Sequence, residues 1–152
     1  MIRSILIGLV AGMRSMAPLA VASTAVARGE LEETGPMALL GHPAVSSGLS
    51  ALAVAEAMGD KLPFAPDRIV IPGIAARIVT GALAGAALAP REQRNVAAVL
   101  AAGAAVAASY WTFRLRVRAM RRYGQARTGV VEDALVLAAS QYLVSGTKGG
   151  GR

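Results

Sequence analysis

Apolar residues along the chain gather into long runs that are separated by short polar or proline-containing segments. From residue 69 to 89 the strongly polar side chains are Arg77 and Thr80, and from residue 96 to 110 they are Ser109 and Tyr110. A soluble amphipathic helix keeps a polar face, whereas a run of about 17–25 apolar residues can cross a bilayer as a helix. The pattern predicts membrane-spanning helices at residues 4–27, 43–59, 69–89, 95–113 and 129–144.

The second and fifth runs are the shortest, and both carry carboxylates, which is typical of spans that are tilted, partly re-entrant or packed inside a bundle. We therefore predict an all-α, polytopic membrane helix bundle with four to five spans. It forms one integral-membrane domain over residues 1–145, followed by a flexible glycine-rich tail at 146–152. Residues 4–27 resemble a signal peptide, but Arg14 interrupts the apolar core, so we interpret them as a retained first helix.

Composition supports a membrane protein and weighs against an enzyme. The chain is 55% hydrophobic with 17 glycines, and charged residues make up 16%, where about 25% is usual for a soluble domain. There is no cysteine and one histidine, His42, so cysteine chemistry and histidine-based metal sites or triads have too few residues. We expect no catalytic residues, no metal and no cofactor.

The basic residues predict an orientation in the membrane. The net charge is +7, and six arginines lie between residues 114 and 127. By the positive-inside rule, we expect the N-terminus and the 114–127 loop to face the cytoplasm. Because the arginines directly follow an apolar run, we expect anionic lipid headgroups, and not nucleic acid, to be their partners. The residues expected at the headgroups are Trp111, Arg114, Arg116, Arg118, Arg121 and Arg122.

Glycines occur at a spacing that lets membrane helices approach closely. The motifs are Gly8-x3-Gly12 and Gly81-x3-Gly85, and the segments that contain them, 5–12 and 78–85, resemble each other. Such seams indicate close packing within one bundle more often than association between chains. We still expect a homo-oligomer, since a bundle of five helices is small for enclosing a pathway.

Charged residues within the apolar runs are the candidate site. Arg14 and Arg77 lie inside spans, where an unpaired charge costs about 2.5–3.5 kcal/mol. On the predicted topology, carboxylates from the second and fifth spans approach one membrane side and can converge on them. The candidate site is Arg14, Glu56, Asp60, Arg77, Glu132 and Asp133. This set could bind an ion or solute, or it could consist of ion pairs that fix the helix register.

Several short motifs, taken in order, resemble a known family. They are Gly12-x-Arg14-Ser15 with Pro18, Glu56-x3-Asp60-Lys61-Leu62-Pro63, Pro72-Gly73-x3-Arg77-x3-Gly81 and Glu132-Asp133-Ala134. In this order they resemble a family of small bacterial inner-membrane proteins, the domain of unknown function number 4126. The resemblance implies a polytopic protein of the bacterial inner membrane and supplies neither an activity nor functional residues.

Two functions remain open from the sequence. The number of charges in so small a membrane domain favours a channel or transporter for a small ion or solute, with the Arg/carboxylate set as its polar site. The alternative is a non-transporting structural or lipid-interacting membrane protein, in which the ion pairs hold the bundle together.

Overall fold

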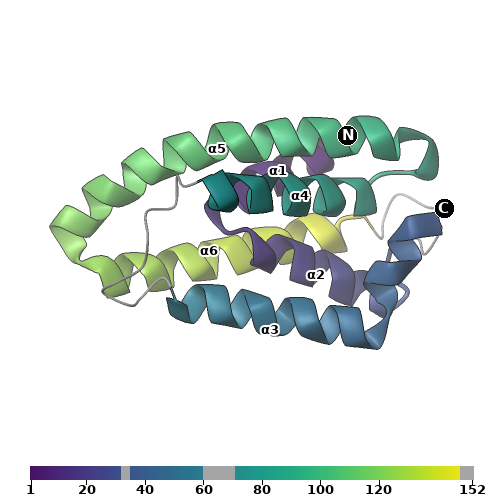
Figure 1. Ribbon diagram of the computed structural model, residues 1–152, viewed down its shortest axis with the longest axis horizontal. Helices are drawn as coiled ribbons and strands as arrows, with labels where there is room; N and C mark the ends of the chain where they lie inside the picture. Colours follow the sequence, from purple (N-terminus) through teal and green to yellow (C-terminus); the bar gives the residue numbers. More distant parts are fainter. Residues whose placement is uncertain (32–34, 60–70, 148–152) are drawn as a thin grey trace.

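The protein is a bundle of helices that run roughly along one axis (Figure 1). The computed structural model describes residues 1–31, 35–59 and 71–147. No strand occurs in those three ranges, so the predicted all-α class is confirmed. The elements are α1 (Ile2–Met13), α2 (Met16–Ala27), the 3-10 helix η1 (Gly35–Gly41), α3 (Pro43–Gly59), α4 (Ile71–Ala87), the 3-10 helix η2 (Arg91–Gln93), α5 (Arg94–Tyr123) and α6 (Gln125–Ser145).

Four of the predicted spans correspond to single helices. The prediction for residues 43–59 coincides with α3, and the third span becomes α4. The fourth predicted span, residues 95–113, is too short. Helix α5 has 30 residues, because it continues through the arginine-rich segment. It ends at Gly124, whose φ of 83° is a left-handed conformation that glycine adopts without strain, and α6 begins at the next residue. Of the predicted tail, residues 148–152 lie outside the described ranges.

The prediction of one helix over residues 4–27 is wrong. The chain leaves the helical conformation at Arg14, which has φ −137° and ψ 125°, and α2 starts at Met16. Helix α2 then reverses direction, so α1 and α2 form a hairpin (Figure 1). Arg14 lies between the two helices, at the tip of the hairpin. Arg3, near the start of α1, lies against Gly146 at the end of α6.

The hairpin also determines at which end of the bundle the N-terminus lies. Along the α1–α5 contact, Gly8 faces Ala101 and Gly12 faces Ala105, so these two helices run parallel. The N-terminus therefore lies at the opposite end of α5 from residues 114–127. A single first span would have placed both at the same end, because it lacks the reversal that the hairpin adds.

The glycine seams pack inside the bundle, on α5. A Cβ at Gly8 would lie 2.3 Å from the main-chain oxygen of Ala101, and one at Gly85 would lie 2.3 Å from the Ala101 Cβ. Both seams therefore contact the same alanine stripe of α5, one from α1 and one from α4. This close approach of three helices explains why glycines occur at corresponding places in the two similar segments.

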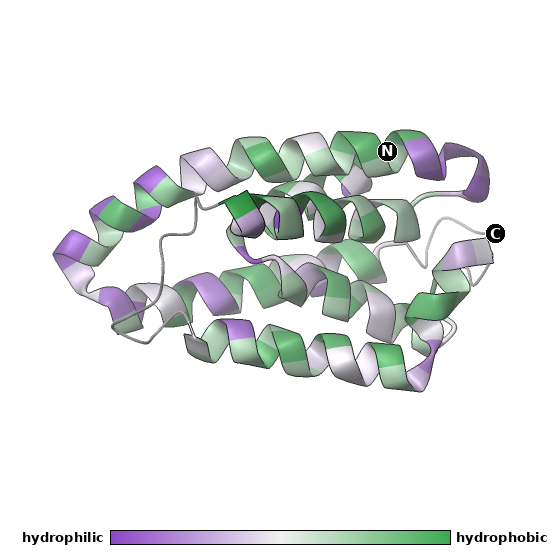
Figure 2. Cartoon of the chain, viewed as in Figure 1, coloured by the Kyte–Doolittle hydropathy of each residue, from purple (hydrophilic) through white to green (hydrophobic). Residues whose placement is uncertain are grey.

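Apolar side chains are found both in the buried core, as Ile7, Leu19 and Val26 are, and on the outside of the bundle. Large apolar side chains face outward on several helices, among them Val99 (72% exposed), Leu52 (51%) and Leu135 (59%). The buried residues include Arg14, Arg77, Glu132 and several serines. Hydrophilic residues gather at the two ends of α5, with an apolar length between them (Figure 2).

In the described part of the chain, one continuous helical stretch is long and apolar enough to cross a membrane, and it runs from Arg91 to Tyr123 (Arg91–Tyr123). The pair Gly35–Gly41 and Pro43–Gly59, bent by 67°, is also long and apolar enough if it counts as one broken span. Helices α1, α2 and α4 are apolar but shorter.

We predict that Gly8→Ala lowers the stability of the bundle by about 1–3 kcal/mol, because its methyl group would overlap the α5 backbone. Gly103→Ala is the matched control, since a Cβ there meets no atom within 4 Å. It should raise stability by about 0.5–1 kcal/mol, because alanine restricts the unfolded chain. Thermal unfolding in detergent measures both, and equal melting temperatures for the two variants would contradict the packing.

Candidate functional site

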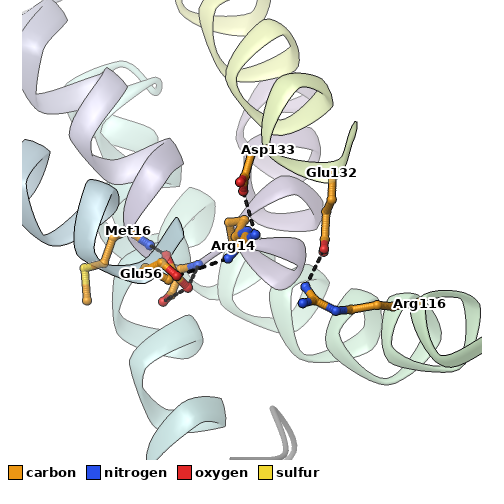
Figure 3. A network of polar contacts seen from close by, with 7 residues as sticks. Arg14, Met16, Glu56, Arg116, Glu132 and Asp133 are labelled. Atoms are coloured by element: carbon orange, nitrogen blue, oxygen red, sulfur yellow. Dashed lines mark hydrogen bonds and ion pairs between the residues drawn. The ribbon is translucent and has the colours of Figure 1, made fainter. Parts of the chain in front are cut away.

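The tip of the α1–α2 hairpin is closed by a carboxylate from α3. The first amides of a helix have no partner within the helix, and they form its positive end. The Glu56 carboxylate accepts hydrogen bonds from them (Figure 3). Its Oε2 accepts from the Met16 amide at 2.9 Å, and its Oε1 accepts from the Ser15 amide at 2.9 Å and from the Ser15 hydroxyl at 2.8 Å. The helix break thus creates donors that one side chain satisfies together.

Arg14 links this hairpin tip to two other helices. Its Nη2 lies 2.6 Å from Oδ1 of Asp133 on α6, and its Nη1 donates to the main-chain oxygen of Glu56 at 3.3 Å. The Arg14 side chain is 2% exposed, against 18% for Asp133. A guanidinium so deeply buried requires paired acceptors, so the contacts of Arg14 join α1, α3 and α6.

A second ion pair lies beside the first. Nη1 of Arg116 on α5 is 2.5 Å from Oε2 of Glu132, and both side chains are 9% exposed. Glu132 and Asp133 are neighbours on α6, yet Glu132 points to Arg116 and Asp133 to Arg14 (Figure 3). Two adjacent carboxylates therefore connect α6 to two different helices.

Arg77 of α4 completes the buried charges. Its side chain is buried, and it interacts electrostatically with four other charged side chains, those of Glu56, Glu132, Arg14 and Arg116. The structure therefore brings together five of the six residues predicted as the site. The sixth, Asp60, lies outside the described residues.

A cavity of about 120 Å³ adjoins the Arg14 contacts. Arg14, Glu56 and Asp133 line it, together with small or apolar side chains of α2, α3 and α6. Val54 and Leu137 line it and are also exposed on the outer surface of the bundle. The cavity therefore offers a small, mainly apolar space beside Arg14, Glu56 and Asp133.

The predicted headgroup residues divide into two groups. Trp111 is 71% exposed, and Arg114, Arg118, Arg121 and Arg122 are exposed on the last turns of α5. Arg116, which we expected among them, is instead held inside by Glu132. Its position on α5 faces α6, and the one-dimensional spacing of the arginines does not reveal which of them turns inward.

Sequence reasoning missed Ser15 and Met16, whose amides hold Glu56. A signal for them exists, because Ser15 is a favoured residue immediately before a helix and Pro18 belongs to a first helical turn. The apolar residues on both sides made the run look continuous. The serine and proline together indicate a second helix start inside it.

The comparisons with known proteins identify the family without adding an activity. The family model for the domain of unknown function DUF4126 matches residues 2–145, so the chain belongs to that family. No curated protein and no solved structure matches it. The predicted family is confirmed, and a function has to be argued from the site.

We predict that Asp133→Ala destabilises the protein by about 3–5 kcal/mol, because it leaves the buried Arg14 guanidinium without its carboxylate. The double variant Arg14→Met/Asp133→Leu should recover at least half of that loss, since it removes both charges. Glu92→Ala, at an exposed carboxylate of η2, is the control and should unfold like the native protein. A double variant no more stable than Asp133→Ala would contradict the pairing; chemical or thermal unfolding in detergent provides the values.

Proposed function

We propose that the protein is a multi-pass protein of the bacterial inner membrane. The observation that supports this is the outer surface of the bundle, where many large apolar side chains are exposed while several charged and hydroxyl side chains are buried. In water such a surface would associate, whereas in lipid it is the favourable one. The buried ionisable residues are then intramembrane charges, which are mostly paired or functional.

Helix lengths support a particular arrangement in the bilayer. Helices α1 and α2 have 12 residues each. At 1.5 Å per residue each is about 18 Å long, too short for a hydrocarbon core of about 30 Å. The α1–α2 hairpin is therefore re-entrant, and its tip lies at mid-depth. Helices α3 and α4, with 17 residues, and α6, with 21, are close to spanning length, and α5 exceeds it.

The charges at the two ends of the bundle support one orientation. The end at the α5–α6 turn carries Arg114, Arg118, Arg121, Arg122 and Arg127 as exposed arginines. Near the opposite end lie Arg3, Arg28, Arg91 and Arg94 together with Glu30 and Glu92. By the positive-inside rule the α5–α6 turn faces the cytoplasm, and the N-terminus faces the other side.

Within this arrangement the polar cluster is the site through which a small ion or solute moves. Three features support transport: a broken re-entrant hairpin, a helix start aimed at a carboxylate, and a cavity beside both. Discontinuous helices with these features are a common way to build mid-membrane binding sites.

The alternative is a non-transporting structural or lipid-interacting protein. One observation favours it: Arg14 pairs with Asp133, Arg116 pairs with Glu132, and the Glu56 carboxylate accepts the Ser15 and Met16 amides, all within one chain. Ion pairs that are complete within one chain can serve only to fix helix register. In that case their removal lowers stability and leaves no transport rate to lose.

A homo-oligomer remains part of the proposal. Both glycine seams are used within the bundle, so a second copy would have to contact an outward apolar face. Helix α3 presents such a face, with Leu52, Val54 and Met58 exposed.

The orientation can be tested directly because the chain has no cysteine. Gln93→Cys and Tyr123→Cys place single thiols at the two ends of α5, both at exposed positions. We expect a membrane-impermeant maleimide to label Gln93→Cys from the periplasmic side of intact cells and Tyr123→Cys only after lysis. Labelling of both before lysis, or of neither, would contradict the spanning arrangement.

Transport can be tested in proteoliposomes loaded with a pH- or ion-sensitive dye. We expect the native protein to carry protons or small ions, and Glu56→Gln to reduce the flux at least tenfold, because an amide cannot replace both acceptor oxygens at the hairpin tip. Glu92→Gln should keep the native rate. If native flux equals that of empty liposomes across several ions while Glu56→Gln melts earlier, the structural alternative holds instead.

A further inference from the structure

A second cavity lies away from the transport cluster, between α5 and α6. The two helices meet at Gly124 and diverge from it (Figure 1). Between them is a cleft of about 190 Å³. Its walls come from α5 and α6, and Met13 at the end of α1 also lines it. The cleft lies near the end of the bundle that carries the exposed arginines.

The interior of this cleft suits hydrocarbon better than an ion. Leu115, Val131 and Leu135 form its apolar walls. The two threonine hydroxyls that line it are used within their own helices: Thr112 donates to the Ala108 carbonyl at 2.7 Å, and Thr128 to the Gly124 carbonyl at 2.8 Å. The charged residues that line it, Arg116 and Glu132, neutralise each other. The cleft therefore offers apolar contacts and no net charge.

The surroundings of the cleft are strongly basic. Five exposed arginines surround this end of the bundle, and none of them forms an ion pair with a carboxylate in the described ranges. They are Arg114, Arg118, Arg121, Arg122 and Arg127. A phosphate group at this end of the bundle meets guanidinium donors while a chain attached to it extends toward the cleft.

We infer that the α5–α6 cleft is a binding site for an anionic phospholipid, with one acyl chain in the cleft and the phosphate at the surrounding arginines. The volume is about six times the 30 Å³ of a liquid water molecule, so it admits a segment of one chain. This inference rests on the proposed membrane placement and is independent of transport. It assigns a bound lipid to a defined position rather than to the basic surface as a whole.

Native mass spectrometry of the full chain, released from detergent with added lipid, tests the site. The probes are dioleoyl phosphatidylglycerol, dioleoyl phosphatidylcholine and soluble glycerol phosphate.

Val131→Trp fills the cleft, and Val130→Trp is its matched control, because Val130 is similarly exposed and does not line the cleft. Leu135→Phe is a second cleft variant in case Val131→Trp does not fold. Arg118→Gln/Arg121→Gln removes positive charge near the cleft, and Arg28→Gln/Arg91→Gln does so at the opposite end.

We expect the native protein to retain phosphatidylglycerol about tenfold better than phosphatidylcholine, and the cleft variants to lose about tenfold of that retention. The Val130→Trp and Arg28→Gln/Arg91→Gln controls should bind as the native protein does, whereas Arg118→Gln/Arg121→Gln should lose the preference for the anionic lipid. Equal retention of both lipids, equal loss in Val130→Trp, or displacement of lipid by glycerol phosphate alone would overturn the site. Alkaline extraction of cell membranes tests separately whether the protein is embedded in the membrane. A failure of the proposed membrane placement is therefore distinguishable from a failure of the lipid site.

Discussion

The constraint on which the structure depends is the break between α1 and α2. Ending one helix and starting another leaves backbone amides without partners, and inside an apolar bundle those amides need an acceptor. Glu56 supplies both carboxylate oxygens to Ser15 and Met16. Arg14, in the extended residue of the break, then contacts the same stretch of α3 and Asp133 of α6. One interruption of the backbone thus determines where four helices meet.

The rest of the bundle is consistent with that interruption. Glycines in α1 and α4 bring both helices against the alanines of α5, which leaves no room for large side chains along that contact. Many large apolar residues lie on the outside of the bundle, and Arg14, Glu132 and several serines are buried. Packing of small residues and buried hydrogen bonds are the interactions that hold helices together where the surroundings are apolar. Stability and the proposed transport site therefore share the same residues.

Much of this arrangement was predictable from the sequence. Long apolar runs predicted α3 and α4 well, and the expectation that charges within apolar runs are paired placed Arg14, Arg77, Glu56, Glu132 and Asp133 in one set. The hairpin was not predicted, because hydropathy averages over the Arg14–Ser15 break and apolar residues flank it on both sides. Without the hairpin, the prediction placed the N-terminus and residues 114–127 at the same end of the bundle. The inward turn of Arg116 depends on tertiary contacts that a run of arginines does not encode.

Amide hydrogen exchange at Ser15 and Met16, measured by NMR on the protein in micelles, tests the central claim most directly. If Glu56 holds the hairpin tip, both amides exchange slowly in the native protein and at least tenfold faster in Glu56→Ala, while amides in the middle of α5 keep their protection. Equal exchange at these two amides in both proteins would show that Glu56 does not close the break, and the account would fail at its starting point.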